Sequence, residues 1–172
     1  MSKNIKTHLY CFDEHRSFTE EIRKKFDDVS KYAVLSFQAQ DEYLKKLSDE
    51  KESKFCKIAI IGLHDATEQY VMFDHLTIDI KKIDRKTGII LICPPDRMDD
   101  VRKTLKFNID AYVPQNANSI LRIHNSVKKL KSEHNIVIFT KRRNLSLIIL
   151  LAFVLFSALA VLIAYLRLPK FF

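Results

Sequence analysis

The most regular feature of the chain is an uninterrupted apolar run near its end. Residues 145–166 read LSLIILLAFVLFSALAVLIAYL and contain no charged side chain. A helix rises about 1.5 Å per residue, so the run is long enough to cross a hydrocarbon core about 30 Å thick. Its polar residues are Ser146, Ser157 and Tyr165, and a hydroxyl in a helix can return its hydrogen bond to the backbone one turn earlier. The pattern predicts a transmembrane helix.

Before this run, short apolar segments alternate with segments of helical periodicity. Strands are predicted at 7–12, 32–37, 57–61, 89–93 and 111–113. Helices are predicted from about residue 17, after residue 37, and over 66–83, 99–107 and 118–132. Strands separated by helices indicate a parallel sheet covered on both faces, because each crossover must pass over a face of the sheet. The chain is therefore predicted to be an α/β domain followed by one transmembrane helix.

The first predicted helix illustrates the periodicity. Ser17 and Glu20 have the spacing of a capping box, which places the start of the helix near Ser17. Its buried side is predicted to consist of four apolar residues, Phe18, Ile22, Phe26 and Val29.

The chain is divided into four predicted parts. Residues 1–134 form the α/β domain, 135–144 a basic juxtamembrane segment, 145–166 the transmembrane helix and 167–172 a short tail. The segment between domain and span, NIVIF followed by TKRRN, contains no linker rich in glycine, proline or serine. Two connections stay open: the last helix of the domain continues into the span, or a short ordered elbow joins them.

Charges beside the apolar run give its predicted orientation. Lys141, Arg142 and Arg143 directly precede the run, whereas only Arg167 and Lys170 follow it. The flank of a transmembrane helix that carries more Lys and Arg residues is retained on the cytoplasmic side of the membrane. No apolar segment that would export the domain stands at the N-terminus. The domain is therefore expected in the cytoplasm, with a single-pass anchor behind it.

The charge of the domain argues against nucleic-acid binding. The net charge is +8, but residues 141–172 hold five cations and no acid, which leaves +3 on the rest of the chain. Two interpretations of the run Lys128, Lys129, Lys131 and 141–143 stay open: contact with anionic lipid headgroups, or a solvated helix face. The three cysteines, Cys11, Cys56 and Cys93, lie in apolar runs without metal-site spacing and are predicted to be reduced core residues.

Residues at the ends of the predicted strands resemble the receiver domain of bacterial two-component response regulators, over about residues 5–133. That family has an acid pair after the first strand, a phosphoaccepting aspartate ending the third, a Ser/Thr ending the fourth, and an aromatic residue and a lysine at the fifth. The corresponding residues here are Asp13 with Glu14, Gly62, Cys93, Tyr112 and Gln115. The spacings of 31, 19 and three residues from Gly62 to Gln115 fit the family.

The resemblance implies a flavodoxin-like, doubly wound, five-stranded parallel sheet whose phosphotransfer chemistry is lost. Phosphotransfer to aspartate needs a carboxylate nucleophile, a divalent cation and donors that neutralise the phosphoryl oxygens. Gly62 has no nucleophile, Gln115 has no charge, and Cys93 has only a weak S–H donor. The domain is interpreted as a pseudo-receiver, without catalysis and without a cofactor.

Two alternatives concern the carboxylates. If the third strand ran longer, Asp65 would face Asp13 and Glu14 and serve as phosphoacceptor or metal ligand. Asp13 and Glu14 themselves are either a residual Mg²⁺ site or an acidic turn that favours the following helix.

The resemblance also indicates a partner-binding face on the fourth helix, fifth strand and fifth helix. This face carries Arg102, Lys103, Lys106, Tyr112, Arg122 and Lys129, so it suits an acidic protein surface or lipid headgroups. The expected function is that of an adaptor subunit or homodimer on the cytoplasmic side of a bacterial inner membrane. The alternative is a phospho-signalling receiver that uses Asp65 or atypical chemistry.

Overall fold

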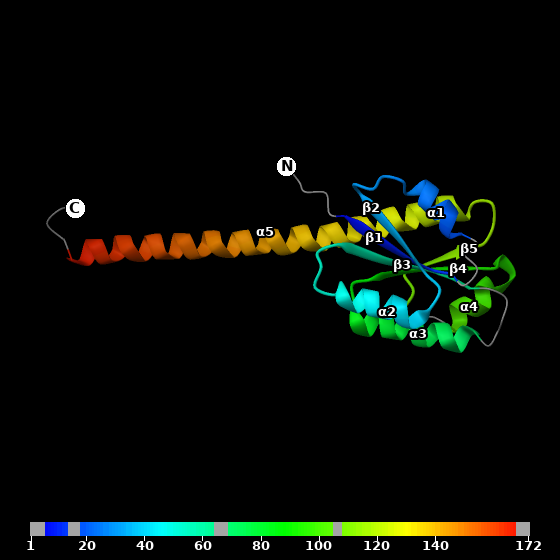
Figure 1. Cartoon of the computed structure of the whole chain (residues 1–172). Coiled ribbons are helices and arrows are strands. Elements are labelled where there is room, and N and C mark those ends of the chain that lie inside the picture. The colour runs from blue at the N-terminus through cyan, green and yellow to red at the C-terminus, as the bar shows by residue number, and fades with distance from the viewer. Residues whose placement is uncertain (1–5, 14–17, 64–68, 105–107, 168–172) are drawn as a thin grey trace. The chain divides into compact units, whose positions relative to one another are not determined.

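A computed structural model describes residues 6–13, 18–63, 69–104 and 108–167 of the chain (Figure 1). The chain divides into two compact units, Met1–His134 and Asn135–Phe172. We describe each unit by itself.

The first unit is built on a five-stranded parallel sheet in the order β2-β1-β3-β4-β5. The strands are β1 (Thr7–Phe12), β2 (Tyr32–Phe37), β3 (Cys56–Gly62), β4 (Gly88–Cys93) and β5 (Ala111–Pro114). The helices are α1 (Thr19–Lys25), α2 (Gln40–Asp49), α3 (Gln69–Ile83), the 3-10 turn η1 (Pro95–Arg97), α4 (Met98–Thr104) and α5 (Ser119–Arg167). The predicted parallel α/β sheet is confirmed, and each strand matches its predicted range to within one residue at either end.

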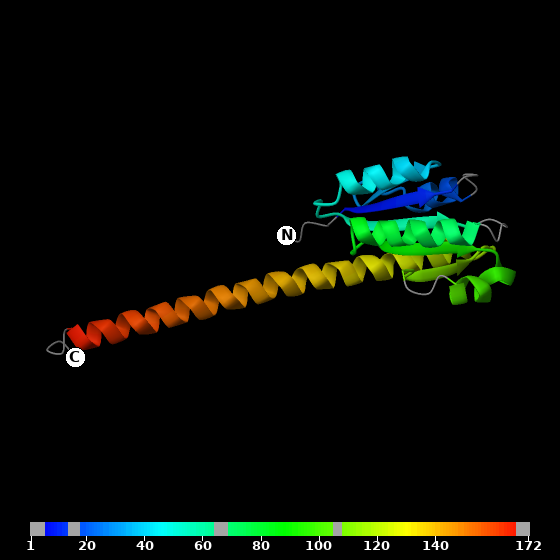
Figure 2. The ribbon, with the colours of Figure 1, turned by 90° about the horizontal axis from the view of Figure 1, so that it is seen from below.

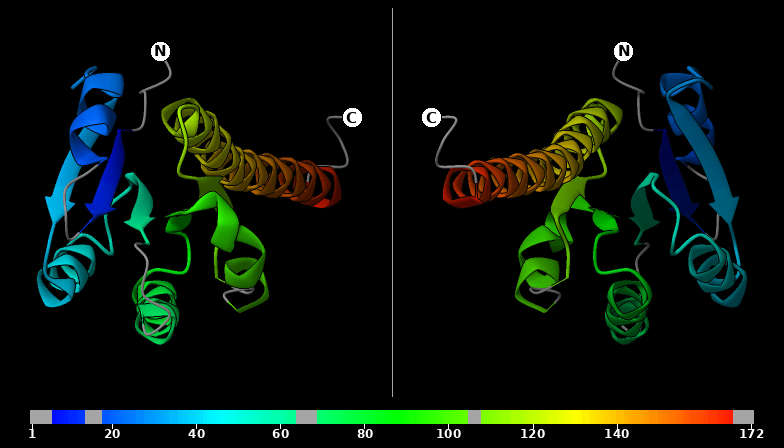
Figure 3. Two further views of the ribbon diagram at one scale, coloured as in Figure 1. Left: turned by 90° about the vertical axis from the view of Figure 1, so that its right-hand side faces the viewer. Right: turned by 90° about the vertical axis from the view of Figure 1, so that its left-hand side faces the viewer.

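Helices cover both faces of the sheet (Figure 3). On one face, Ile22 and Phe26 of α1 and Ile123 and Val127 of α5 pack against the strands. On the other, α2, α3 and α4 bury side chains such as Tyr43, Phe73 and Val101, and α2 and α3 lie side by side (Figure 2). The strands are apolar on both faces because both faces are covered.

The first helix is shorter than predicted. It begins at Thr19 and ends at Lys25, and Phe18 occupies the N-cap position without a side-chain cap. Phe18, Ile22 and Phe26 are buried as expected, but Val29 is 74% exposed. The prediction for Val29 was wrong because the helix has ended four residues earlier. Ser17 lies outside the described residues.

The last helix, α5, is continuous from Ser119 to Arg167. Of the two predicted connections, the structure therefore has the uninterrupted helix and no elbow. Among the described residues, α5 is the one helix long and apolar enough to cross a membrane, judged by length and composition. In the second unit the Ser157 hydroxyl donates to the Phe153 carbonyl oxygen at 2.9 Å, one turn earlier. A serine within the apolar run thus satisfies its own hydrogen-bonding group.

Two carboxylates hold the amino-terminal edge of the sheet together. Lys57, buried at the start of β3, donates from Nζ to Asp84 Oδ2 at 2.7 Å and to the Lys51 carbonyl oxygen at 3.0 Å. Burial acts to raise the pKa of Asp84, but the hydrogen bonds from Lys57 and the Lys86 backbone N–H, together with the charges of both lysines, leave the pKa below its usual value. This pair links β3 to the segment that follows α3.

The second carboxylate is Glu50, which follows α2. It accepts a hydrogen bond from the buried Tyr10 hydroxyl, and its oxygens lie 2.9 Å from Lys46 Nζ and 2.8 Å from His8 Nδ1. Burial acts to raise its pKa, but hydrogen bonds from Tyr10, Lys46 and His8 lower it to about 2. Glu50 thus ties the end of α2 to β1.

We predict that Asp84→Asn lowers the free energy of unfolding at neutral pH by about 3 kcal/mol, because it leaves the buried Lys57 ammonium unpaired. Ionised Asp84 stabilises the fold above its unfolded-state pKa of about 4, and this contribution is lost as the pH falls through the lower folded-state pKa. The difference between wild type and variant should therefore shrink below about pH 4. Unfolding of the full chain in detergent micelles, followed by circular dichroism, measures it.

The matched control is Asp79→Asn, because Asp79 pairs with the exposed Lys82 at 3.0 Å. Such exposed pairs contribute about 0.5 kcal/mol or less. Equal losses of unfolding free energy for the two variants, or a loss for Asp84→Asn that is independent of pH, would contradict the stabilising role of the Lys57–Asp84 pair.

Candidate functional site

The candidate site lies at the carboxyl-terminal edge of the sheet, where doubly wound folds bind their ligands. Gly62 ends β3, Cys93 ends β4, and Gln115 follows β5. The backbone N–H of Gln115 donates to the Cys93 carbonyl oxygen at 2.8 Å, which extends the pairing of β4 with β5. The backbone therefore brings the three predicted positions to one edge of the sheet, but their side chains have different surroundings.

Gly62 lies directly under an aromatic ring. A Cβ atom at this position would come closer to Phe18 Cε1 than real Cβ atoms approach any neighbour, and 3.3 Å from Phe18 Cδ1 and Cζ. Phe18 is 9% exposed and belongs to the core between the sheet and α1. The ring occupies the space that a side chain at the predicted phosphoacceptor position would need, so glycine is the residue that fits there.

The residue after Gly62 supplies no nucleophile either. Leu63 is 1% exposed and packs into the core on the opposite face, and its N–H donates to the Ile92 carbonyl oxygen at 2.8 Å. The described end of β3 thus carries no carboxylate. Asp65, the alternative phosphoacceptor, lies outside the described residues.

Asp13 is fully buried and positions the neighbouring aromatic residue. Its Oδ2 accepts a hydrogen bond from the Phe18 backbone N–H at 3.2 Å. The predicted partner Glu14 lies outside the described residues. Among those that are described, no three His, Cys, Asp or Glu side chains gather in a way that would hold a metal ion. Asp13 therefore has a visible structural role at the start of α1, and the Mg²⁺ site remains a prediction.

Cys93 is not brought together with Gly62. Gly62 is paired with Ile92 in the register of β3 and β4, so the side chain of Cys93, one residue later, points to the other face of the sheet. There it is buried, and its Sγ lies 3.6 Å from Met98 Sδ. Burial raises the pKa of the Cys93 thiol to about 11. The thiol is therefore a neutral core group.

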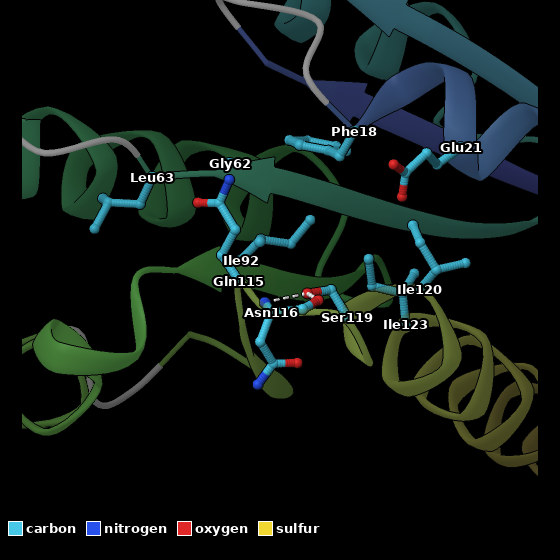
Figure 4. A pocket seen from close by; sticks show the side chains of 10 residues that line it. All are labelled: Phe18, Glu21, Gly62, Leu63, Ile92, Gln115, Asn116, Ser119, Ile120 and Ile123. Atoms are coloured by element: carbon cyan, nitrogen blue, oxygen red, sulfur yellow. Dashed lines mark hydrogen bonds between the residues drawn. The ribbon is translucent and has the colours of Figure 1, made fainter.

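Gln115 does join Gly62, in a small pocket of about 180 Å³. Figure 4 shows the Gln115 amide directed toward Gly62, with the Ser119 hydroxyl bonded to the Asn116 N–H at 2.6 Å. The pocket is lined by Phe18, Glu21, Gly62, Leu63, Ile92, Gln115, Asn116, Ser119, Ile120 and Ile123. Among the described residues that line the pocket, the one charged side chain is the carboxylate of Glu21. A carboxylate repels the oxygens of a phosphoryl group.

Sequence reasoning identified Gly62 and Gln115 but missed Phe18 as the residue that decides the site. Phe18 was assigned only to the buried side of a helix. Its contact with Gly62 joins segments 44 residues apart and depends on where α1 begins. A glycine ending an apolar strand was the one available signal that another group approaches closely there.

The predicted partner-binding face is partly described. The Arg102 guanidinium carbon lies 5.7 Å from the centre of the Tyr112 ring, a cation–π arrangement. Burial raises the pKa of Tyr112, and the charge of Arg102 opposes this in part. Arg122 is exposed on α5, and Lys106 lies outside the described residues. Arg102 and Tyr112 thus form one continuous surface of α4 and β5.

Comparison with known proteins supports the fold. No protein-family model and no curated protein matches the chain. A response regulator receiver domain protein from Clostridium thermocellum is similar in structure, with a TM-score of 0.60, 12% identity, and coverage of 76% of this chain and 98% of that one. A CheY-like receiver domain protein from Methanospirillum hungatei has a TM-score of 0.56 and 14% identity, covering 76% and 97%.

A structure described as an adenylate cyclase from Rhodopirellula baltica has a TM-score of 0.63 and 7% identity, covering 80% of this chain and 96% of that one. At these identities the likeness establishes the fold alone. The first unit therefore has the flavodoxin-like fold of receiver domains, as the sequence resemblance predicted.

We predict that Gly62→Ala lowers the free energy of unfolding by about 2 kcal/mol, because the added methyl group clashes with the Phe18 ring. Phe18→Ala alone should cost about 3 kcal/mol through the cavity it leaves. In the double variant the methyl group enters that cavity, so the combined loss should be smaller than the sum. Thermal unfolding of the four proteins gives the coupling energy.

The control for this cycle is Phe73→Leu, a core change on the other face of the sheet. Combined with Gly62→Ala it should be additive. Additive losses for Gly62 and Phe18 would show that the ring does not restrict the glycine.

We also predict that the three thiols do not react with a thiol reagent in the folded protein at neutral pH. Cys11, Cys56 and Cys93 are buried and free of disulfides, and burial raises their pKa values to about 12, 11 and 11. Only the thiolate is nucleophilic. Titration of the protein with the thiol reagent should label all three cysteines in denaturant and none in its absence. Fast labelling of the native protein would show that the thiols are not buried.

Proposed function

We propose that this chain is a membrane-anchored pseudo-receiver: a non-catalytic module that binds partner proteins on the cytoplasmic face of a bacterial inner membrane. It acts as an adaptor subunit of a membrane assembly, or as a homodimer. The observation that carries this proposal is the packing of Phe18 over Gly62.

This packing supports a non-catalytic role in two ways. It fills the position from which a phosphoaccepting side chain would project, and the adjoining pocket offers the neutral amides of Gln115 and Asn116 in place of a cation. Phosphoryl transfer depends on electrostatic neutralisation of the transferred group. The chain has the fold of receiver domains, but its described residues do not provide the cationic groups that would neutralise a phosphoryl group.

The apolar run supports the anchor. It lies within α5, whose length and composition suit a membrane span, and the cations at 141–143 precede it. The greater cationic flank favours a cytoplasmic domain. The run has no charge through which one helix alone would conduct an ion or proton. Its contribution is therefore to locate the domain at the membrane.

Surface chemistry supports a protein partner. The Arg102–Tyr112 pair and Arg122 present cationic and aromatic groups, and both kinds of residue are enriched where proteins meet. An acidic partner surface would complement them.

The test combines membrane integration with a phosphorylation assay. The full-length chain should resist extraction from membranes at alkaline pH, and removal of 145–166 should release it. Incubated with Mg²⁺ and a small acyl phosphate, the intact protein should gain no phosphoryl mass, while a receiver domain that has its aspartate does. An adduct that Asp65→Ala abolishes would replace this proposal with the phospho-signalling alternative, and a soluble full-length chain would refute the anchor.

A further inference from the structure

The amino-terminal edge of the sheet collects the carboxyl-terminal ends of the helices. Asp84, after α3, contacts Lys57 at the start of β3, and Glu50, after α2, contacts His8 in β1. Leu130 of α5 packs over Gly88 at the start of β4. The last turns of the helices are basic: Arg23, Lys24 and Lys25 in α1, Lys46 in α2, and Lys81 and Lys82 in α3.

Several of these cations are already engaged by acids or carbonyl groups. Lys46 pairs with Glu50, Lys81 with Asp110, and Lys82 with Asp79. Lys31 likewise pairs with Asp28 at 2.6 Å. Other cations have no ion pair with a described residue, and we call six of them the basic edge: Lys25, Lys54, Arg85, Lys86, Lys128 and Lys131. The exposed acids Asp27 and Glu52 lie on the same loops, so an excess of positive charge remains.

Members of the basic edge lie beside α5. Lys131 of α5 places its Nζ 4.7 Å from the centre of the Tyr32 ring, at the start of β2. Burial, then the charges of Lys128 and Lys25, lower the pKa of His124. Burial, then the charge of Lys86, lower the pKa of His134, with Asp84 opposing. Lys86 and Lys131 are therefore near the last residues of the first unit.

The opposite edge of the sheet carries the opposite charge. The first turns of three helices there are acidic, with Glu20 and Glu21 in α1, Asp41 and Glu42 in α2, and Asp99 and Asp100 in α4, whereas those of α3 and α5 contain no acid. Such charges also complement the helix dipoles. Together with the basic edge, these acids give the domain a positive amino-terminal edge and a negative carboxyl-terminal edge of the sheet.

The covalent connection limits how far the basic edge lies from the lipid. Lys141, the first of the cations before the apolar run, follows His134 by seven positions. This length of chain reaches about 25 Å when extended and about 10 Å when helical. Attraction between exposed charges fades over about 8 Å at physiological ionic strength. The covalent connection thus keeps His134 within about 25 Å of the cations that precede the apolar run.

We propose that the basic edge binds the anionic lipid headgroups of the membrane in which the chain is anchored. This inference rests on the proposed anchor and adds an orientation to it. Contact at the positive end directs the acidic edge, with the pocket at Gly62, away from the lipid. The domain is thereby presented to partners in one orientation.

The test uses the full chain in nanodiscs of phosphatidylcholine, with or without phosphatidylglycerol, that carry a headgroup-linked nitroxide quencher. A fluorophore is attached through Glu52→Cys at the basic edge or Asp99→Cys at the acidic edge, the native cysteines being buried. Quenching at position 52 should be several-fold stronger in anionic than in neutral discs and should weaken in high salt. At position 99 it should stay low in both.

A charge-reversal variant identifies the groups responsible. Lys54→Glu, Arg85→Glu and Lys86→Glu together should reduce quenching at position 52 in anionic discs to the neutral level. The control, Arg23→Glu, Lys45→Glu and Arg97→Glu, changes the net charge equally at solvent-accessible sites outside the basic edge and outside the partner-binding face, and it should retain the quenching. Circular dichroism verifies that both variants are folded.

Three results would overturn the inference. Equal quenching in the two lipids, or no effect of the charge reversal, would refute headgroup binding while leaving the anchor intact. If the charge reversal has no effect on quenching, but the wild-type protein captures a partner protein that the reversed variant does not, the basic edge binds an acidic protein instead. Failure of the chain to enter nanodiscs would overturn both this inference and the proposed anchor.

Discussion

The close contact between the Phe18 ring and Gly62 is the constraint on which the site depends. It connects the start of α1 to the end of β3, and Asp13 fixes it by accepting the Phe18 backbone N–H at 3.2 Å. Because Phe18 stands at the N-cap of α1, the same contact sets where Ile22 and Phe26 enter the core shared with α5. Packing of this kind tolerates little added volume. A structural contact thus occupies the position predicted, from the sequence resemblance, to correspond to the phosphoacceptor of receiver domains.

The two ends of the sheet have different physical properties. At the carboxyl-terminal edge, the described residues supply a pocket whose one charged side chain is the Glu21 carboxylate, and the first turns of α1 and α2 add further acids. At the amino-terminal edge, the half-buried carboxylates of Glu50 and Asp84 tie the loops to the strands, and exposed cations surround them. Such a division suits the proposed function, in which the domain is oriented at one end and binds a partner through its surface.

The sequence was sufficient for the fold because its apolar runs are long and its strands are buried on both faces. It failed where tertiary contacts decide. Val29 follows the helical period, yet α1 ends before it, and the strand predicted at 57–61 gave no sign that Asp84 would hold the ammonium of its first residue, Lys57. Gly62 and Cys93 were expected to share a site. Gly62 is paired with Ile92, however, and successive side chains of a strand point to opposite faces, so the Cys93 side chain lies on the other face of the sheet. Phe18 over Gly62 depends on packing between distant segments, which no local pattern encodes.

The central claim is that the domain works by binding a partner at the membrane. Affinity purification of the full-length protein from its native membranes in mild detergent, with mass spectrometry and stoichiometry, tests it most directly. The account predicts a membrane complex in a fixed ratio, lost with Arg102→Glu and kept with Lys45→Glu, an equal charge change on α2. Recovery of the protein as a lone monomer, or with only a sensor kinase or a response regulator, would contradict it.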